Sequence, residues 1–286
     1  MAVYTLGSIN IDHIYHVPHI PRPGETLTAT ALTQGLGGKG ANQSVAAARA
    51  GAKVRHIGAV GPGADPTLAE LAAEGIDISR IARLGIPTGH AIISLDPQAE
   101  NAITVFPGAN RALTATMAEA ALAGAQSGDI LLMQNETSAQ VETARRAARL
   151  GLRLFYSPAP FDLAALRAVL PFADLLLMND GEAGDLRRDN GALPDIAMIV
   201  TRGVEGATWL TPGCDPLSLP AFPVEALDTT GAGDCFAGNI AAALDAGLPQ
   251  DQAMRRALAA AALQVTRPGA APAMPRIAET LALLSR

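Results

Sequence analysis

The stretch ALDTTGAGDCFAGNI, residues 226–240, places a glycine-rich turn directly before an apolar helix. After the turn, at residues 231–234, apolar residues recur at helical spacing: Phe236, Ile240, Ala243 and Leu244. Free backbone N–H groups and the positive end of the helix dipole meet at such a helix start, so the turn predicts an anion site. Asp234 would repel a bound phosphate unless it had a task, and accepting a proton from an attacking hydroxyl is one. Alternatively, Asp234 only caps the helix, since Asp is a favourable N-cap residue.

Outward from this stretch, short apolar runs alternate with helical patterns. The runs lie at residues 3–9, 54–60, 129–134, 152–157, 173–179 and 196–201. The helical patterns lie at residues 40–51, 114–125, 138–151, 162–170, 233–247 and 249–266. This alternation predicts a doubly wound α/β fold, in which a mostly parallel sheet has helices on both faces. We interpret the whole chain, residues 1–286, as one domain.

Two segments depart from the alternation. Residues 11–33 and 89–106 are strand-like and interrupted by Pro, Gly and polar residues, which is typical of hairpins. They predict a small sheet that projects from the main domain as a lid. Residues 207–222 predict another hairpin near the C-terminus.

Composition excludes several classes of partner. A net charge of -6 and a pI near 5.4 argue against a nucleic-acid surface, which needs clustered Lys and Arg. The first residues lack an export signal, and no apolar run reaches the roughly eighteen residues of a membrane helix. Cys214 and Cys235 are too few for a disulfide framework, which suits a reducing compartment. We therefore expect a soluble, cytoplasmic protein without nucleic-acid or membrane partners.

A second glycine motif, QGLGGKGANQ at residues 34–43, has the G-x-G-x-x-G spacing and ends like a P-loop. The P-loop hypothesis fails because Thr33 stands where a glycine is required, and because no Ser or Thr follows the lysine. A dinucleotide turn would need a buried strand before it and an acidic residue about twenty positions later, but the preceding segment is polar and the next carboxylate is Asp65. What remains is a turn that lets backbone approach a ligand, with Lys39 and Asn42 at a helix start. A plain capping turn would leave both side chains without a role.

Three motifs together resemble the ribokinase-like (PfkB) carbohydrate kinase family over nearly the whole chain. They are DTTGAGDCFAG at 228–238, GGKGANQ at 37–43 and GSINIDH at 7–13. In that family the early turn contacts the sugar and the late turn contacts the phosphates. The resemblance implies an ATP-dependent kinase acting on the primary hydroxyl of a pentose, with ribose the first candidate. It also implies Mg²⁺ and a monovalent cation, K⁺, as cofactors, and a homodimer formed through the lid.

The resemblance assigns the sugar and catalytic residues. The implied sugar contacts are Asn10 and Asp12 at the end of the first strand, Gly38, Lys39, Asn42 and Glu136. Carboxylate, amide and ammonium groups suit a polyol, which offers many donors and acceptors. Glu136 could instead be an exposed charge at a helix N-terminus. Asp234 would be the general base, and Gly231, Ala232 and Gly233 would form the anion hole for the γ-phosphate in flight.

The nucleotide and ion sites follow from the same resemblance. The implied nucleotide contacts are Asn179, Thr201, Gly203, Gly206 and Gly233. Glu182 would organise Mg²⁺ through water. The implied ligands of the monovalent cation are Asp228, Thr230, Val265, Pro268 and Ala270. Without the family, these segments would be a polar strand-to-helix turn, a hairpin and a surface turn.

Three departures from the family pattern affect the nucleotide side and the lid. Ser157 replaces an amide near the nucleotide, and Leu258 stands where some relatives place a histidine near the adenine, so base contact would be apolar. Residues 61–77 are shorter than usual and lack the paired acidic residues of the family. The last departure affects the neighbourhood of the lid and hence the choice of sugar.

Other functions stay open at this stage. The substrate could be deoxyribose, fructose, a nucleoside or a sugar phosphate. A sugar phosphate would favour additional basic residues near the lid, where Arg22 is the only one in residues 11–33. A catalytically silent sugar-binding protein on the same fold is the alternative from another class. An intact Asp234 argues against it, because a silent protein needs no base beside the anion hole.

Two further signals are discounted. His13, His16 and His19 would not converge on one metal ion, because residues 13 and 19 face one side of a strand, residue 16 faces the other, and a proline intervenes. Cys235 at a helix start could be a reactive thiolate, or a small residue that fills the helix start.

Overall fold

The computed structural model describes residues 1–98 and 100–285, and within them the main sheet has nine strands. In spatial order they are β13 (Leu217–Leu219), β12 (Ala207–Leu210), β11 (Met198–Thr201), β10 (Leu175–Asn179), β9 (Arg153–Ser157), β8 (Ile130–Gln134), β1 (Val3–Leu6), β4 (Val54–Val60) and β5 (Ile81–Arg83). All neighbours from β11 to β5 pair in parallel, and β12 and β13 form an antiparallel hairpin at one edge. The predicted doubly wound fold and the hairpin at 207–222 are confirmed.

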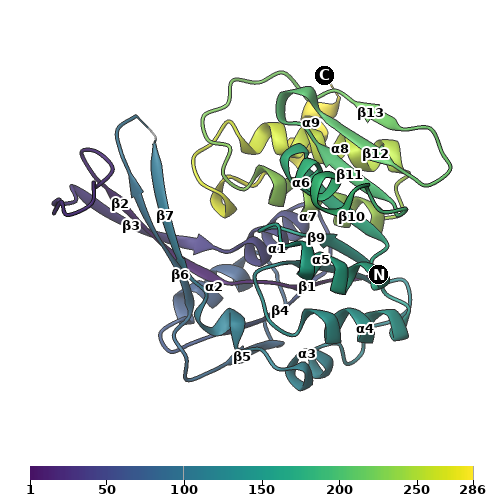
Figure 1. Cartoon of the computed structure of the whole chain (residues 1–286), viewed down its shortest axis with the longest axis horizontal. Helices are drawn as coiled ribbons and strands as arrows, with labels where there is room; N and C mark the ends of the chain where they lie inside the picture. The colour runs from purple at the N-terminus through teal and green to yellow at the C-terminus, as the bar shows by residue number, and fades with distance from the viewer. Residues whose placement is uncertain (99, 286) are drawn as a thin grey trace.

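Helices cover both faces of the main sheet (Figure 1). One face carries α1 (Lys39–Arg49), α2 (Asp65–Ala73), α7 (Ala232–Asp245) and α8 (Gln250–Gln264). The other carries α3 (Ala115–Ala121), α4 (Gln140–Leu150), α5 (Leu163–Val169) and α6 (Asp180–Asn190), while α9 (Ile277–Leu284) packs on α8. Successive strand residues feed opposite cores: Leu131 packs on the α4 side and Leu132 on the α7 side. Both faces are buried, which explains the continuous apolar runs of these strands.

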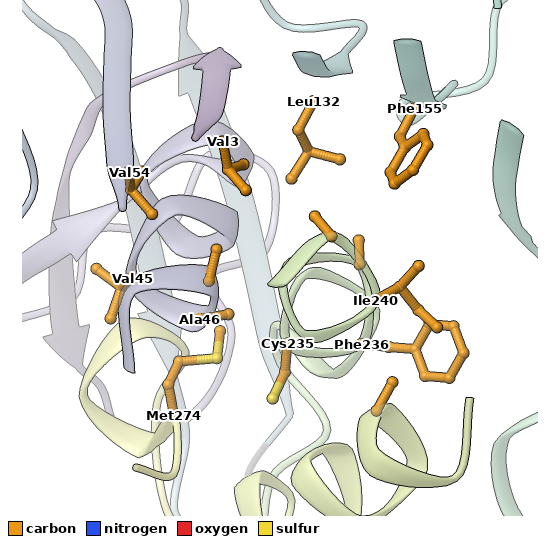
Figure 2. Close-up of a cluster of buried hydrophobic side chains, with 14 of the residues drawn as sticks. Val3, Val45, Ala46, Val54, Leu132, Phe155, Cys235, Phe236, Ile240 and Met274 are labelled. Atoms are coloured by element: carbon orange, nitrogen blue, oxygen red, sulfur yellow. The ribbon is translucent and has the colours of Figure 1, made fainter. Parts of the chain in front are cut away.

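Helices α1 and α7 lie side by side beneath the sheet, as Figure 2 shows with Val45 and Ala46 on α1 and Cys235 on α7. Gly238 makes this approach possible, since a Cβ there would lie 2.5 Å from the Gln43 carbonyl oxygen. The close packing brings the start of α7 against the start of α1. These are the two helix starts that follow the two glycine motifs.

A second, smaller sheet projects from the main body (Figure 1). Its strands, in order, are β3 (Ala31–Gly37), β2 (Asn10–His16), β6 (Gly89–Leu95) and β7 (Asn101–Phe106). The two predicted hairpins are confirmed, and a parallel pairing of β2 with β6 joins them. We call this element the small sheet.

The chain leaves the main sheet at a close backbone contact. Three residues separate β1 from β2, and only Gly38 separates β3 from α1. Gly7 and Gly40 meet here, since a Cβ on Gly7 would lie 2.3 Å from the Gly40 Cα. The glycines therefore let the first strand and the first helix touch where the two sheets join.

Some predicted boundaries were wrong. The first strand ends at Leu6 rather than residue 9, so Asn10 and Asp12 lie on β2 of the small sheet and not at the end of the first strand. Residues 17–30 of the predicted lid segment form a loop, and β3 extends to Gly37, beyond the predicted limit. Helices α2 and α9 and strand β5 were not predicted. Pro66 in the first turn of α2 obscures its helical pattern, and β5 has only three residues.

Candidate active site

The side chain of Asp234 lies in the first turn of α7, with only 7% of the residue exposed. Gly231, at the helix N-cap, has a φ of 79°, which favours glycine. Asn42 Nδ2 donates to Asp234 Oδ2 at 3.0 Å, and Gln43 Nε2 donates to Oδ1 at 2.9 Å. Both carboxylate oxygens are thus bound from α1, so the hypothesis that Asp234 only caps its own helix was wrong.

One lysine faces several carboxylates here. Burial raises the pKa of Asp234, and the Lys39 ammonium opposes that rise. The pKa of Lys39 is itself raised, chiefly by the charge of Asp234 and further by Glu136 and Glu182. Burial also raises the pKa of Glu182. Lys39 therefore compensates carboxylates that come from three different parts of the chain.

The carboxylates of Asp12 and Glu136 form the second polar cluster, at the junction of the sheets. Burial, followed by the charge of Glu136, raises the pKa of Asp12 to about 6. Glu136 Oε2 accepts a hydrogen bond from the Lys39 backbone N–H at 3.0 Å and another from the Ser8 hydroxyl. A Cβ on Gly37 would lie 2.2 Å from the Asp12 carboxylate, so the missing side chain leaves room for that group.

Asn110 fixes Asn10, and sequence reasoning missed it. Its Nδ2 donates to Asn10 Oδ1 at 2.8 Å, and its Oδ1 accepts from the Ile9 N–H at 3.0 Å. Asn110 is 2% exposed and lies in the short 3₁₀ helix Gly108–Arg111, after β7. The Asn10 oxygen is thereby engaged, which leaves its NH₂ group for a ligand.

An inner pocket of about 200 Å³ lies beside Asp234 and Lys39. Its lining includes Lys39, Asp234, Ser157, Asn179, Glu182, Thr201 and the turn residues Gly231, Ala232 and Gly233. An apolar pocket of about 500 Å³ adjoins it, and the two pockets share lining residues that include Thr201, Gly233 and Phe236. Gly203, Gly206, Val224, Leu258 and Val265 line the apolar pocket. The structure thus brings the residues assigned to the nucleotide around one continuous space.

Glu182 belongs to a capping box. Its Oε2 accepts from the Asn179 backbone N–H at 2.9 Å, and its own N–H donates to Asn179 Oδ1 at 2.9 Å. No group of three or more metal-binding His, Cys, Asp or Glu side chains occurs in the described part of the chain. A lone carboxylate beside an amide fits Mg²⁺ that is held mainly by phosphates and water.

Two of the histidines near the N-terminus form side-chain hydrogen bonds. His13 is hydrogen-bonded to Gln34, and His19 is hydrogen-bonded to Glu25.

The segments that the resemblance assigns to a monovalent cation lie against each other and touch the turn at residues 231–234. Asp228 accepts hydrogen bonds from the N–H groups of Thr230 and Gly269, each at 2.8 Å. Gln264, a residue that sequence reasoning missed, donates to the carbonyls of Thr230 at 2.7 Å and Gly269 at 3.1 Å. These carbonyls each keep a second lone pair, so the donor set fits a cation. A Cβ on Gly231 would lie 2.8 Å from the Ala270 Cβ, so this loop touches the turn.

A buried carboxylate at a glycine-rich helix start, next to a polar pocket that opens into an apolar one, has the layout of a phosphotransferase on a doubly wound fold. The turn at residues 231–233 and the Asp234 carboxylate line the inner pocket, and the apolar pocket adjoins it. No helix among the described residues has the length and apolar character to span a lipid bilayer.

Comparison with known proteins agrees with this class. Residues 2–277 match the sequence model of the pfkB family carbohydrate kinases, and the chain belongs to this family. A ribokinase of Haemophilus influenzae is 36% identical over 298 residues, covering 98% of this chain and 97% of its own. A ribokinase crystal structure from Thermotoga maritima superimposes with a TM-score of 0.91 at 32% identity, over 100% of both chains. The ribokinase of Arabidopsis thaliana, complexed with ribose and ATP, has a TM-score of 0.86 at 26% identity over 100% of both chains. The protein is thus a carbohydrate kinase.

Proposed function

We propose that this kinase is a ribokinase that transfers the γ-phosphoryl group of ATP to the primary hydroxyl of ribose. The observation that carries the proposal is the buried Asp234, held by two amides beside the anion-hole turn and open to the inner pocket. Asp234 takes the proton of the hydroxyl, the sugar oxygen forms a bond to the γ-phosphorus, and the bond to the β-phosphate oxygen breaks to give ADP. The similarity to ribokinases over the full chain length supports ribose as the sugar.

The sugar lies at the junction of the two sheets. Asn10, Asp12, Gly38, Lys39, Asn42 and Glu136 surround this junction and supply donors and acceptors for sugar hydroxyls. Lys39 also lines the inner pocket, so its charge lies where the phosphoryl group is transferred. The N–H groups of Ala232 and Gly233 face the same developing charge.

The nucleotide occupies the remaining space. Asn179, Thr201, Gly203 and Gly206 contact the phosphates and the ribose of the nucleotide. The adenine base of the nucleotide enters the apolar pocket beside Leu258. Mg²⁺, organised through water by Glu182, neutralises charge on the phosphates when bound. A monovalent cation, K⁺, would be held by Asp228 and the carbonyls of Thr230, Val265, Pro268 and Ala270, and would brace the turn that carries the anion hole.

The small sheet serves as a lid on a single domain. Its closure over the sugar excludes water, which would otherwise attack the γ-phosphate. Both cysteines are free, Cys214 exposed and Cys235 buried, which favours a cytoplasmic location.

The small sheet also pairs two copies of the chain into a homodimer. Ile103 and Val105 are each 53% exposed and share one face with Asp12, because Val105 pairs with Ala91 and Ala91 with Asp12. We expect Ile103→Asp to give a monomer in analytical ultracentrifugation, because a charge would be buried in the interface. Ile92→Asp, on the opposite face, is the matched control and should stay dimeric. A dimeric Ile103→Asp protein would disprove this interface.

The proposed function is tested by ATP turnover against ribose, deoxyribose, fructose, nucleosides and sugar phosphates, with and without K⁺. We expect ADP release to depend on ribose and to rise with K⁺. Fast turnover of another substrate and slow turnover of ribose would replace ribose by that substrate. Absence of turnover with every sugar, together with a sugar-induced rise in melting temperature, would favour the silent sugar-binding protein.

A further inference from the structure

A line of buried amides leads from the main sheet to the proposed base. Gln134, at the end of β8, donates from Nε2 to Gln43 Oε1 at 2.6 Å. Gln43, on α1, donates in turn from Nε2 to Asp234 Oδ1 at 2.9 Å. Gln43 is 0% and Gln134 is 1% exposed, and neither lines the inner pocket. Gln43 therefore contacts Asp234 from outside the inner pocket, and Gln134 supports Gln43 from further away.

The two oxygens of Asp234 have different partners. Because Gln134 donates to the Gln43 oxygen, the Gln43 amide can turn over only if Gln134, whose Oε1 has no partner among the described residues, turns over with it. Asn42 donates to Oδ2, but its own Oδ1 is buried without a partner. A buried acceptor without a partner is costly, so this oxygen is available to accept a hydrogen bond during the reaction.

Proton transfer to Asp234 can supply that hydrogen bond. A protonated oxygen must donate a hydrogen bond, so protonation at Oδ1 would direct its O–H against the N–H of Gln43, and two buried amides, Gln43 and Gln134, would have to turn over to place an oxygen there. At Oδ2, a half-turn of the Asn42 amide alone replaces its NH₂ group by the free oxygen, which then accepts the new O–H. Oδ2 is therefore the oxygen whose partner adapts to protonation with the smaller rearrangement.

We propose that Gln43 and Gln134 are positioning residues that fix Oδ1 of Asp234, so that Oδ2 is the oxygen that takes the proton of the sugar hydroxyl. This inference rests on the proposed role of Asp234 as the base. The proton moves from the hydroxyl to Oδ2 as the oxygen–phosphorus bond forms and ADP leaves, and no other reactant is required.

Charged and titratable groups from the neighbouring elements also interact with Asp234, and a pH test has to take them into account. They are Lys39 on α1, Glu136 after β8, Glu182 on α6 and Cys235 on α7. The hydrogen bond from Gln43 lowers the pKa of Asp234 and so favours the ionised, active base. Removing this donor leaves the other groups in place and raises the pKa.

The experiment compares pH profiles of Gln43→Leu, Gln134→Leu and the double variant. We expect Gln43→Leu to lower kcat at least about tenfold with KM for both substrates within about twofold, and to move the acid limb of kcat up by about one pH unit. Gln134→Leu should shift the limb in the same direction by less, because the Gln43 amide can then turn over. The double variant should be no worse than Gln43→Leu alone, because Gln134 acts through Gln43.

Asn239→Leu is the matched control, since Asn239 is a buried amide on the same helix that donates to the Cys235 carbonyl. It should lower the melting temperature without moving the acid limb. An unmoved limb in Gln43→Leu, or additive losses in the double variant, would overturn the inference. If Gln43→Leu fails to fold, a wild-type profile for Gln134→Leu overturns it equally. Full turnover by Asp234→Asn would instead refute the base itself, so the two failures are distinguishable.

Discussion

Asp234→Asn is expected to lower kcat at least about a hundredfold while sugar and ATP still bind, the usual scale for losing a positioned base. An amide oxygen is too weakly basic to take the proton of a hydroxyl. The substitution keeps the size of the side chain, so the anion-hole turn beside it retains its shape. Steady-state kinetics gives kcat, and calorimetric titration with each substrate gives the two affinities. A kcat within about tenfold of the wild type would refute the role of Asp234 as base.

The same variant should melt at a higher temperature than the wild type near pH 7. Burial raises the pKa of Asp234, so the folded state binds its proton more tightly than the unfolded state does. The stability from this group is therefore present at low pH and is lost as pH rises through the folded pKa. The substituted amide carries no charge at any pH, so the gain in melting temperature should shrink as the pH is lowered. A gain that is independent of pH would contradict this account.

Lys39→Met should lower kcat/KM for the sugar by about a hundredfold, the scale of removing one donor that stabilises a transferring group. Lys39 is the charge that opposes the raised pKa of Asp234 and also faces Glu136 and Glu182. Without it, the phosphoryl group meets uncompensated carboxylates, and the acid limb of the pH profile should move upward. Lys53→Met, at an exposed lysine, is the control and should behave as the wild type. Equal activity of both variants would exclude Lys39 from the site.

Local sequence patterns were enough to predict most of the helices and strands. The run at 54–60 has the bounds of β4, because a strand buried on both faces is apolar throughout. The glycine turns marked the starts of α1 and α7, since few other residues allow such close approach and positive φ. The predicted end of the first strand was wrong because Gly7 to Ile9 stay buried after the strand ends, so small residues and an isoleucine extend the strand-like pattern through the turn.

Long-range polar partners could not be predicted in this way. Gln43 and Asp234 are 191 residues apart, and Asn110 and Asn10 are 100 apart, so no spacing in the sequence connects them. Gln134 sits at the end of an apolar run, where a glutamine resembles an ordinary strand end. Gln264 lies in the last turn of a helix, and only the fold brings it to the loops at 228–230 and 267–270. The residues proposed to contact ligands come from motifs in the sequence, whereas their buried hydrogen-bond partners are brought to them only by the fold.

In the proposed complex the sugar lies at the junction of the two sheets, so the small sheet would rotate about the point where the sugar binds. Both β2 and β6 start at the junction, at Asn10 and Gly89, and run seven residues outward, roughly 20 Å at the usual rise per residue. A rotation of about ten degrees at the junction would displace the outer end of the small sheet by roughly 3 Å over that length. A sugar bound at Asn10 and Gly38, as proposed, would therefore move the outer end of the small sheet further than the residues that it contacts. If two chains pair through these sheets, movement of one small sheet displaces the small sheet of the other chain. Sugar binding in one site would then change the conformation of the second site.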